Sequence, residues 1–185
     1  MSRLSPKLSG LPLIRLLCRA RRDRSGATAV EFALVAAPFF FLLFAMIEIA
    51  AVFFTSTVLE NAVLETAREI RTGQAQAAGM TRAGFQDEIC TRIEVVGNCD
   101  RLEFDVRVFQ GFNTVDQSSP VNEDGTLNND SFGWDPGQAG DIVLVRVFYR
   151  WSLLTPNFGG ALSNMGGNQR LLSAASVFRN EPFDD

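Results

Sequence analysis

Two residues at the start of a long apolar segment have types and a spacing that could take part in chemistry. Gly26 directly precedes this segment, and a single carboxylate, Glu31, follows five residues later. Glycine has no Cβ and adopts the extended or unusual backbone that a protease cleft demands, so the Gly26–Ala27 bond is a candidate cleavage site. Cleavage would create an α-amino group with an ordinary pKa of about 7.7 to 8.0. That amine, in a neighbouring copy of the chain, could pair with Glu31.

A cation is needed there because the apolar surroundings penalise an isolated charge. Placing a charge deep in a membrane helix costs about 2.5 to 3.5 kcal/mol on insertion scales. The alternative is that Glu31 lies at the water boundary and is only an interfacial residue. The residue types alone leave both interpretations open.

The apolar segment itself predicts one transmembrane helix over residues 27–57. From Phe32 to Phe54 nearly every side chain is apolar, and about 20 such residues at about 1.5 Å rise cross a hydrocarbon core of about 30 Å. Glu48 is the one charge in this segment and lies about 25 Å beyond Glu31 along the axis. We expect Glu48 to reach the far membrane interface and not to be buried. Pro38 should bend the helix because it removes a backbone donor.

The charges on the two sides of the helix differ in sign. Residues 1–25 hold seven basic residues and one acidic residue, whereas residues 58–185 hold ten basic and eighteen acidic residues. Because basic residues keep the adjacent end of a membrane helix in the cytoplasm, residues 1–26 should form a cytoplasmic leader and residues 58–185 a periplasmic domain. A retained basic tail on anionic lipid is the alternative for the leader. The acidic domain argues against nucleic-acid binding.

These features together resemble a known family. The basic leader, Gly26, the sequence Ala27-Thr28-Ala29-Val30-Glu31-Phe32 and the long apolar helix are similar to a type IV prepilin signal, and in detail to the TadE-like pseudopilins of the tight-adherence (Flp) pilus assembly system. The resemblance implies cleavage after Gly26 by a membrane aspartyl prepilin peptidase, and a role for Glu31 in subunit packing. It also implies partners among other pilins and pilus assembly platform proteins, and no cofactor. Phe32 stands where major Flp pilins usually have Tyr, which, with the long downstream domain, favours a minor pseudopilin.

Two of the three cysteines lie on the predicted exported side. Cys90 and Cys99 are a short loop apart, and an oxidising compartment favours a disulfide between them. Closing a loop of about 10 residues contributes roughly 2.5 to 3 kcal/mol in the chain-entropy model. Cys18 lies in the leader and should stay reduced. A metal site is disfavoured because the chain has no histidine and no second cysteine pair.

The domain is expected to begin with helices. Residues 58–72 continue the long helix, with Gly73 as its stop. Residues 74–79 read as a flexible linker or frayed turn. Thr81 is a candidate N-cap of a second helix that ends at Gly97-Asn98. On residues 58–72, apolar side chains recur at helical spacing and form one stripe, which consists of Leu59, Ala62, Val63, Ala67 and Ile70.

Three strands should follow. Residues 102–108 alternate apolar and charged side chains, which predicts a half-buried strand. Residues 142–151 and 171–178 predict two more. The polar residues 110–140 form a long loop, in which Asp124-Gly125 could close a hairpin; its acidic residues do not fit an EF-hand pattern for calcium. The predicted fold is α+β, a long helix and a second helix beside an antiparallel sheet of about three strands.

The absence of histidine from the sequence removes the familiar Ser-His and Cys-His nucleophile pairs, so we do not predict an enzyme. The leading hypothesis is a minor pseudopilin in the bacterial inner membrane, cleaved after Gly26 and acting in pilus assembly or adhesion. The alternative is an unprocessed, single-pass periplasmic binding module that holds a ligand or partner with residues 110–140.

Overall fold

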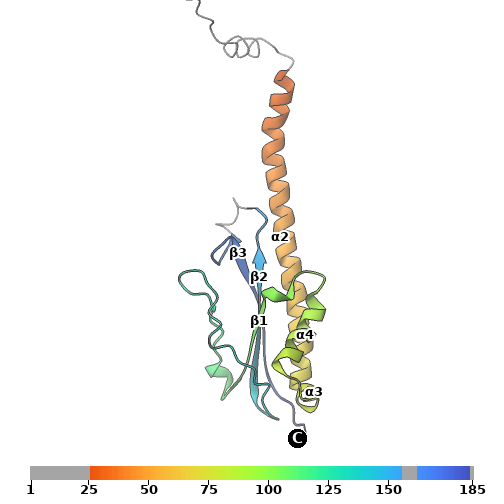
Figure 1. Cartoon of the computed structure of the whole chain (residues 1–185), viewed down its shortest axis with the longest axis vertical. Helices are drawn as coiled ribbons and strands as arrows, with labels where there is room; N and C mark the ends of the chain where they lie inside the picture. The colour runs from red at the N-terminus through yellow and green to blue at the C-terminus, as the bar shows by residue number, and fades with distance from the viewer. Residues whose placement is uncertain (1–25, 156–161, 184–185) are drawn as a thin grey trace, which may run out of the picture. The chain divides into compact units, whose positions relative to one another are not determined.

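The computed structural model describes residues 26–155 and 162–183. Its helices are α2 (Ala27–Arg71), α3 (Gln74–Ala77) and α4 (Arg82–Ile93), and its strands are β1 (Leu102–Phe109), β2 (Ile142–Ser152) and β3 (Gln169–Arg179) (Figure 1). Two single-turn 3-10 helices, η2 (Cys99–Arg101) and η3 (Phe112–Thr114), flank β1. The predicted α+β class is confirmed. The predicted leader, including Cys18, lies outside the described residues except for Gly26.

Helix α2 contributes to both compact units of the chain, residues 1–43 and residues 44–185. Of the first unit, the structure describes residues 26–43, in which the large apolar side chains are exposed; Phe32, Leu34 and Val35 are each 71% exposed. Among the described residues, α2 is the one helix long and apolar enough to cross a membrane, with a mean hydropathy of 2.4 over its most apolar 18 residues. The prediction that one helix continues without a break to residue 71 is confirmed.

The C-terminal end of α2 is fixed by a glycine. Gly73 has a φ of 77°, the left-handed conformation that stops helices and that other residues rarely adopt. A Cβ at this position would also overlap the ring of Phe183. Arg71 in the last turn pairs with Glu181 at 3.3 Å. The predicted stop at Gly73 is confirmed.

The segment after Gly73 is a short helix, so the prediction of a flexible linker was wrong. Gln74–Ala77 forms α3, in which Ala75 is 1% exposed. The Gln76 side-chain amide donates to the carbonyl oxygens of Pro136 and Gly137 at 3.0 and 3.2 Å. These contacts join residues 60 positions apart in the chain, and no local pattern reveals them.

Helix α4 begins as predicted and ends earlier than predicted. Thr81 is its N-cap, and its hydroxyl accepts a hydrogen bond of 3.1 Å from the Gly84 N–H. Phe85, Ile89 and Ile93 are at most 1% exposed. The helix stops at Ile93, and a turn follows at residues 94–96.

The sheet is antiparallel with the order β1-β2-β3. One face packs against α2 and α4, and the apolar stripe predicted on α2 is buried there, with every member at most 3% exposed. Val143, Val145 and Val147 of β2 lie opposite this stripe and are 0% exposed. The core lies between α2, α4 and this face; its largest fully buried apolar side chains are Phe85, Phe104, Leu59, Ile70, Ile89 and Ile93.

The other face of the sheet is also covered around Asp105 and Phe148, so the strand predicted as half-buried at residues 102–108 is more buried at its centre than expected, while Glu103 and Arg107 stay partly exposed. Asp105 is 0% and Phe148 3% exposed. The end of the loop 110–140 folds back over this face: the Phe132 ring stacks on Phe148 with centroids 5.2 Å apart, and the Gly133 N–H donates to the Asp105 carboxylate at 2.9 Å. We call residues 132–135 the roof segment. The burial of Asp105 was not predicted because its carboxylate contacts this segment, which comes from a distant part of the chain, and not water.

The roof segment is attached to β1 by backbone hydrogen bonds. The Val106 N–H donates to the Gly133 carbonyl at 3.0 Å, and the Asp135 N–H donates to the Val106 carbonyl at 2.9 Å. Further back in the loop, Val121 pairs with Leu127 across a turn that contains Asp124 and Gly125. The predicted small hairpin is therefore confirmed.

Candidate functional site

The predicted processing site, the Gly26–Ala27 bond, lies at the N-terminal end of α2. Gly26 is exposed, and a Cβ built on it would meet no described atom within 4 Å. Helix α2 begins at the next residue, Ala27, which is also exposed. An exposed glycine directly before a helix is a backbone that a protease can reach. Cleavage after Gly26 stays a prediction.

The predicted assembly residues lie one turn into α2. Glu31 and Phe32 are exposed, Phe32 by 71%. Within the described residues no hydrogen bond or ion pair involves the Glu31 carboxylate. Ala27, which cleavage after Gly26 would make the first residue, and Glu31 are four residues apart and so lie on the same side of the helix. The pairing of Glu31 with another molecule stays a prediction.

Glu48 behaves in the opposite way, and the prediction that it is not buried was wrong; its position at the far membrane interface stays a prediction. Its side chain is 2% exposed. The Leu154 N–H and the Thr155 hydroxyl donate hydrogen bonds to its two oxygens, and the Thr155 N–H donates a third at 3.1 Å. The segment that leaves β2 therefore closes on α2 around the carboxylate. Glu48 and Leu154 are 106 residues apart, so sequence spacing carries no signal for this contact.

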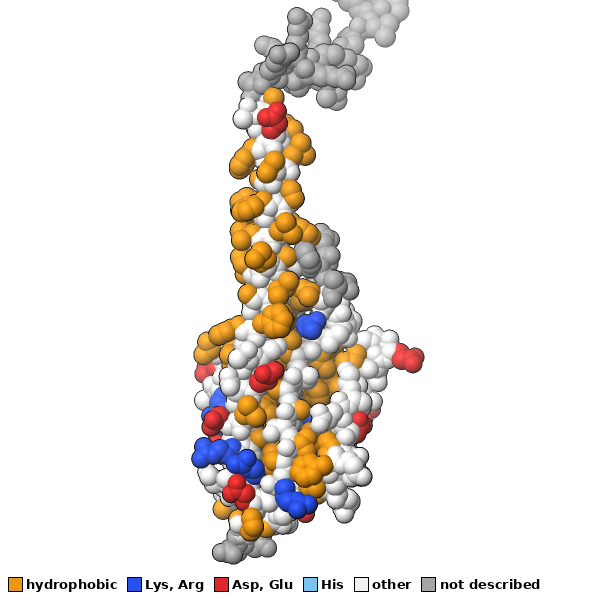
Figure 2. All heavy atoms as spheres, turned by 180° about the vertical axis from the view of Figure 1, so that it is seen from behind, with side chains coloured by type: hydrophobic (Ala, Val, Ile, Leu, Met, Phe, Trp, Pro, Cys, Tyr) orange, Lys and Arg blue, Asp and Glu red, His pale blue; other side chains and the backbone are white. Residues whose placement is uncertain are grey.

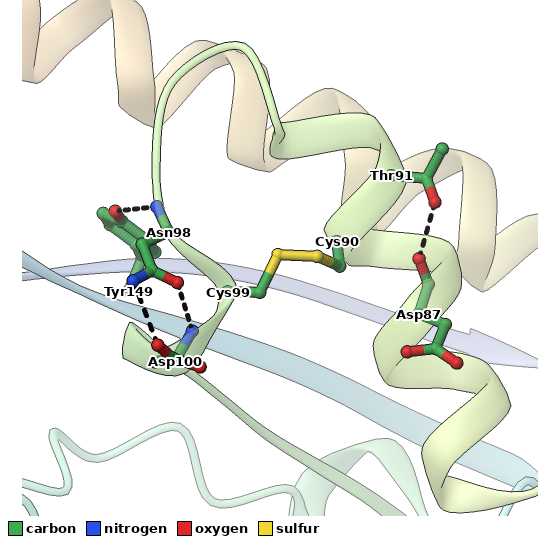
Figure 3. The surroundings of a disulfide bond; sticks show 7 residues. All are labelled: Asp87, Cys90, Thr91, Asn98, Cys99, Asp100 and Tyr149. Atoms are coloured by element: carbon green, nitrogen blue, oxygen red, sulfur yellow. Dashed lines mark hydrogen bonds between the residues drawn. A yellow bond between two sulfur atoms is a disulfide. The ribbon is translucent and has the colours of Figure 1, made fainter.

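The predicted cysteine pair lies at disulfide distance. The Cα atoms of Cys90 and Cys99 are 5.6 Å apart, and the structure joins the sulfur atoms (Figure 3). The bond ties the last part of α4 to η2 and so closes the turn that leads into β1.

The same turn also contacts the sheet through a tyrosine (Figure 3). The Asn98 N–H donates to the Tyr149 hydroxyl at 3.1 Å, and the Asn98 side-chain oxygen caps η2 by accepting from the Asp100 N–H at 3.0 Å. Gly97 is required because a Cβ would overlap the Tyr149 hydroxyl. Tyr149 is 3% exposed, so it packs inside the domain.

A buried charge cluster under the loop was missed by sequence reasoning. The Asp105 carboxylate accepts a hydrogen bond from Arg146 at 2.9 Å and forms an ion pair with Arg107 at 2.7 Å. Arg146 also donates to the Ser118 carbonyl at 3.2 Å. The cluster therefore fastens the loop to the sheet. The alternation of charged residues in β1 and β2 was the available signal, because Asp105 and Arg146 pair across the two strands.

The loop carries an acidic group whose ionisation responds to this cluster. Hydrogen bonds from the Ser118 N–H and hydroxyl lower the pKa of Asp116 below its ordinary value, and Arg146 and Arg107 lower it further through their charge. Next to this loop is a cavity of about 210 Å³, lined by Ser118, Pro120, Arg146, Phe148 and residues of β3. Among the described residues, no group of three or more His, Cys, Asp or Glu side chains is placed to hold a metal ion.

Comparisons with known proteins bear on the first part of the chain. No curated protein and no solved structure matches the chain. A family model described as TadE-like protein matches residues 26–68. The matched segment begins at Gly26, contains Glu31, Phe32 and Glu48, and ends within α2. The resemblance predicted from the sequence is therefore confirmed: residues 26–68 of this chain form a TadE-like segment.

Proposed function

We propose that this chain is a minor pseudopilin of a tight-adherence (Tad) pilus, cleaved after Gly26 and held in the membrane by α2. The TadE-like match over residues 26–68 is the observation that carries this proposal, because it points to a protein associated with the Tad pilus. The finer role, in pilus assembly or adhesion, is inferred from the residues at the start of α2.

Glu31 supplies the proposed assembly contact. After cleavage, the α-amino group of Ala27 in a neighbouring subunit pairs with the Glu31 carboxylate. The pair offsets the cost of about 2.5 to 3.5 kcal/mol for a lone charge in a membrane helix. The exposure of Glu31 and the lack of a described partner in its own chain support this arrangement. Phe32 and the other exposed apolar side chains of this segment then contact lipid or the helices of other pilins.

The proposed location follows from the helix and the charges. The length and hydropathy of α2 fit membrane anchoring. The basic residues before Gly26 and the acidic domain after residue 58 support an inner-membrane protein with its N-terminus in the cytoplasm and its domain in the periplasm. A disulfide between Cys90 and Cys99 is consistent with that compartment.

The proposed role is structural and not catalytic. The proposed partners are the prepilin peptidase, other pilins and pseudopilins, the assembly platform proteins and membrane lipid. No cofactor or nucleic acid has a part in it.

The decisive experiment is to identify the first residue of the mature protein. Membrane-purified chain, analysed by intact mass and N-terminal sequencing, should begin at Ala27. Gly26→Ile should block cleavage because a β-branched side chain restricts the backbone at the scissile position. Gly10→Ile, the same change elsewhere in the leader, is the matched control and should be cleaved normally. A chain that begins at Met1 or Ser2 in the unchanged protein would reject processing.

The second candidate function is an unprocessed, membrane-anchored binding module. The cavity beside Ser118 and Arg146 favours it, because this cavity lies under the loop 110–140. Ser173→Leu, a substitution in the cavity wall, would fill it. Native mass spectrometry should then show loss of a bound molecule if the module function holds, whereas a pseudopilin should support pilus formation as before.

A further inference from the structure

A groove lies between α2 and the beginning of β3, and it shares Leu171 and Ser173 with the cavity under the loop. It has a volume of about 240 Å³. Ile49, Phe53 and Ser56 of α2 form one wall, and Leu162, Arg170 and Leu172 form much of the other. Arg170 is the one charged residue among those that line it.

The guanidinium of Arg170 in this groove has N–H donors that no described residue accepts. Arg170 pairs in register with Trp151, and it has the same parity along β3 as Leu172 and Ala174, which face the core; its side chain is therefore on the α2 side of the sheet. One of its guanidinium nitrogens donates to the Leu162 carbonyl at 2.7 Å. No ion pair involves Arg170 within the described residues. A guanidinium carries five N–H donors, so most remain available for an anion.

The groove opens where the apolar part of α2 ends. Phe53 is 69% and Phe54 58% exposed, and Ile49 is 37% exposed. These residues close the apolar segment that fits a membrane span. Figure 2 shows apolar side chains crowded around a basic side chain where α2 reaches the domain. In an anchored chain, the groove therefore faces the boundary between hydrocarbon and lipid headgroups.

We propose that this groove binds a phospholipid with an anionic headgroup. The acyl chain lies along Ile49 and Phe53, and the phosphate accepts hydrogen bonds from Arg170. Arginine suits a phosphate because its planar fork donates two parallel hydrogen bonds. The inference rests on the membrane anchoring in the proposed function, and not on cleavage or pilus assembly.

A second copy of the chain fits the groove less well. A packed helix would bury Arg170, and a buried cation without an acidic partner is strongly destabilising. The apolar part of α2 in another copy offers Glu31 and Glu48 as acids. Glu48 already accepts three hydrogen bonds in its own chain, and Glu31 lies about 25 Å from it along the helix.

Lipid selectivity can be measured by fluorescence quenching in proteoliposomes. The full chain is reconstituted in phosphatidylcholine with a fixed minority of phosphatidylglycerol, and bromine is placed on the acyl chains of one lipid or the other at equal mole fraction. Trp151 reports on the groove through its pairing with Arg170. We expect brominated phosphatidylglycerol to quench about threefold more than brominated phosphatidylcholine, the preference that a partly exposed ion pair provides.

Two pairs of variants separate the groove from general effects. Arg170→Gln should lower the quenching ratio to about one, while Arg179→Gln, the same charge change at the exposed far end of β3, should keep it. Ser56→Phe fills the groove and should remove the preference. Thr57→Phe, at an exposed neighbouring position on α2, should leave it unchanged.

The outcomes distinguish this proposal from the proposed function. Flotation of the proteoliposomes tests anchoring by itself; a chain that does not float overturns anchoring and the lipid site together. A chain that floats but shows equal quenching by both lipids overturns the lipid site alone. Equal quenching together with a disulfide-linked dimer of a Phe53→Cys, Cys18→Ser variant would show that a second copy occupies the groove instead.

Discussion

Glu31 and Glu48 are the two carboxylates in the apolar part of α2, and the chain treats them differently. Glu48 is 2% exposed and accepts hydrogen bonds from two backbone N–H groups and a hydroxyl. Glu31 is exposed, and no described residue donates to it. The same residue type, 17 positions apart in one helix, has three hydrogen-bond donors within the chain in one case and none among the described residues in the other.

This difference separates a structural role from a functional one. A carboxylate that the fold surrounds with donors stabilises the fold, and its removal costs folding free energy. A carboxylate without donors contributes little to folding, so its presence in an apolar segment calls for a partner. Substitution of each carboxylate tests whether it stabilises the fold or pairs with another molecule.

Glu31→Ala should have the largest effect, and the effect should be on assembly. We expect surface pili to fall more than tenfold, because the neighbour's amine loses its partner. Electron microscopy and quantification of sheared fibres would measure this. Glu60→Ala, which removes an exposed carboxylate farther along α2, is the control and should leave pili unchanged. Pili as abundant in Glu31→Ala as in the unchanged protein would contradict the pairing.

Asp105→Ala should be the most destabilising change to the domain. It leaves the buried Arg146, with a side chain only 7% exposed, without its acidic partner. Breaking a buried ion pair in this way costs about 3 to 5 kcal/mol. Urea unfolding of the detergent-solubilised chain, followed by tryptophan fluorescence, would measure the loss. Glu123→Ala, in the exposed part of the same loop, should change stability little, and a similar small loss for Asp105→Ala would show that the cluster does not hold the roof segment.

Glu48→Ala should lower the free energy of unfolding by about 2 to 3 kcal/mol, since it removes charge-assisted hydrogen bonds around a buried side chain and leaves the N–H groups of Leu154 and Thr155 without their acceptor. Glu48→Gln keeps one acceptor and should cost less. Thermal unfolding in detergent compares the two variants with Glu60→Ala. If Glu48→Ala unfolds at the same temperature as the Glu60→Ala control, then Glu48 contributes no more to stability than an exposed carboxylate, and the contrast with Glu31 fails.

These carboxylates also show what the sequence can and cannot predict. Local patterns predicted α2, its stop at Gly73, the N-cap at Thr81 and the three strands, because periodicity and capping depend on neighbouring residues. The partners of Glu48 and Asp105 come from segments far away in the chain, so their burial was not predicted. For the same reason α3 was taken for a linker, and β1 was expected to expose one face.

The smallest predicted effect is on the titration of Asp124. The Thr126 hydroxyl, and then its N–H, lower the pKa of this exposed carboxylate below the ordinary value of 3.8. A lowered pKa in the folded state adds stability at pH values above the ordinary pKa, and this stability is lost as pH falls through the lowered one. Thr126→Val should therefore move the pKa of Asp124 back up. NMR titration of its side-chain carboxyl carbon would show the shift, with Asp116, held by Ser118, as the unchanged reference.

The roof segment has a consequence for how subunits could meet in a fibre. Residues 132–135 cover the outer face of the sheet at β1 and β2, and α2 and α4 cover the other face, so the sheet of a neighbour could stack only on β3, where Ser173 and Ala175 are exposed. Lateral contacts in an assembly must then use helix flanks, strand edges, loop tips and this strip of β3. Such contacts are small and polar compared with stacked sheets. The apolar part of α2 would then provide most of the contact between subunits.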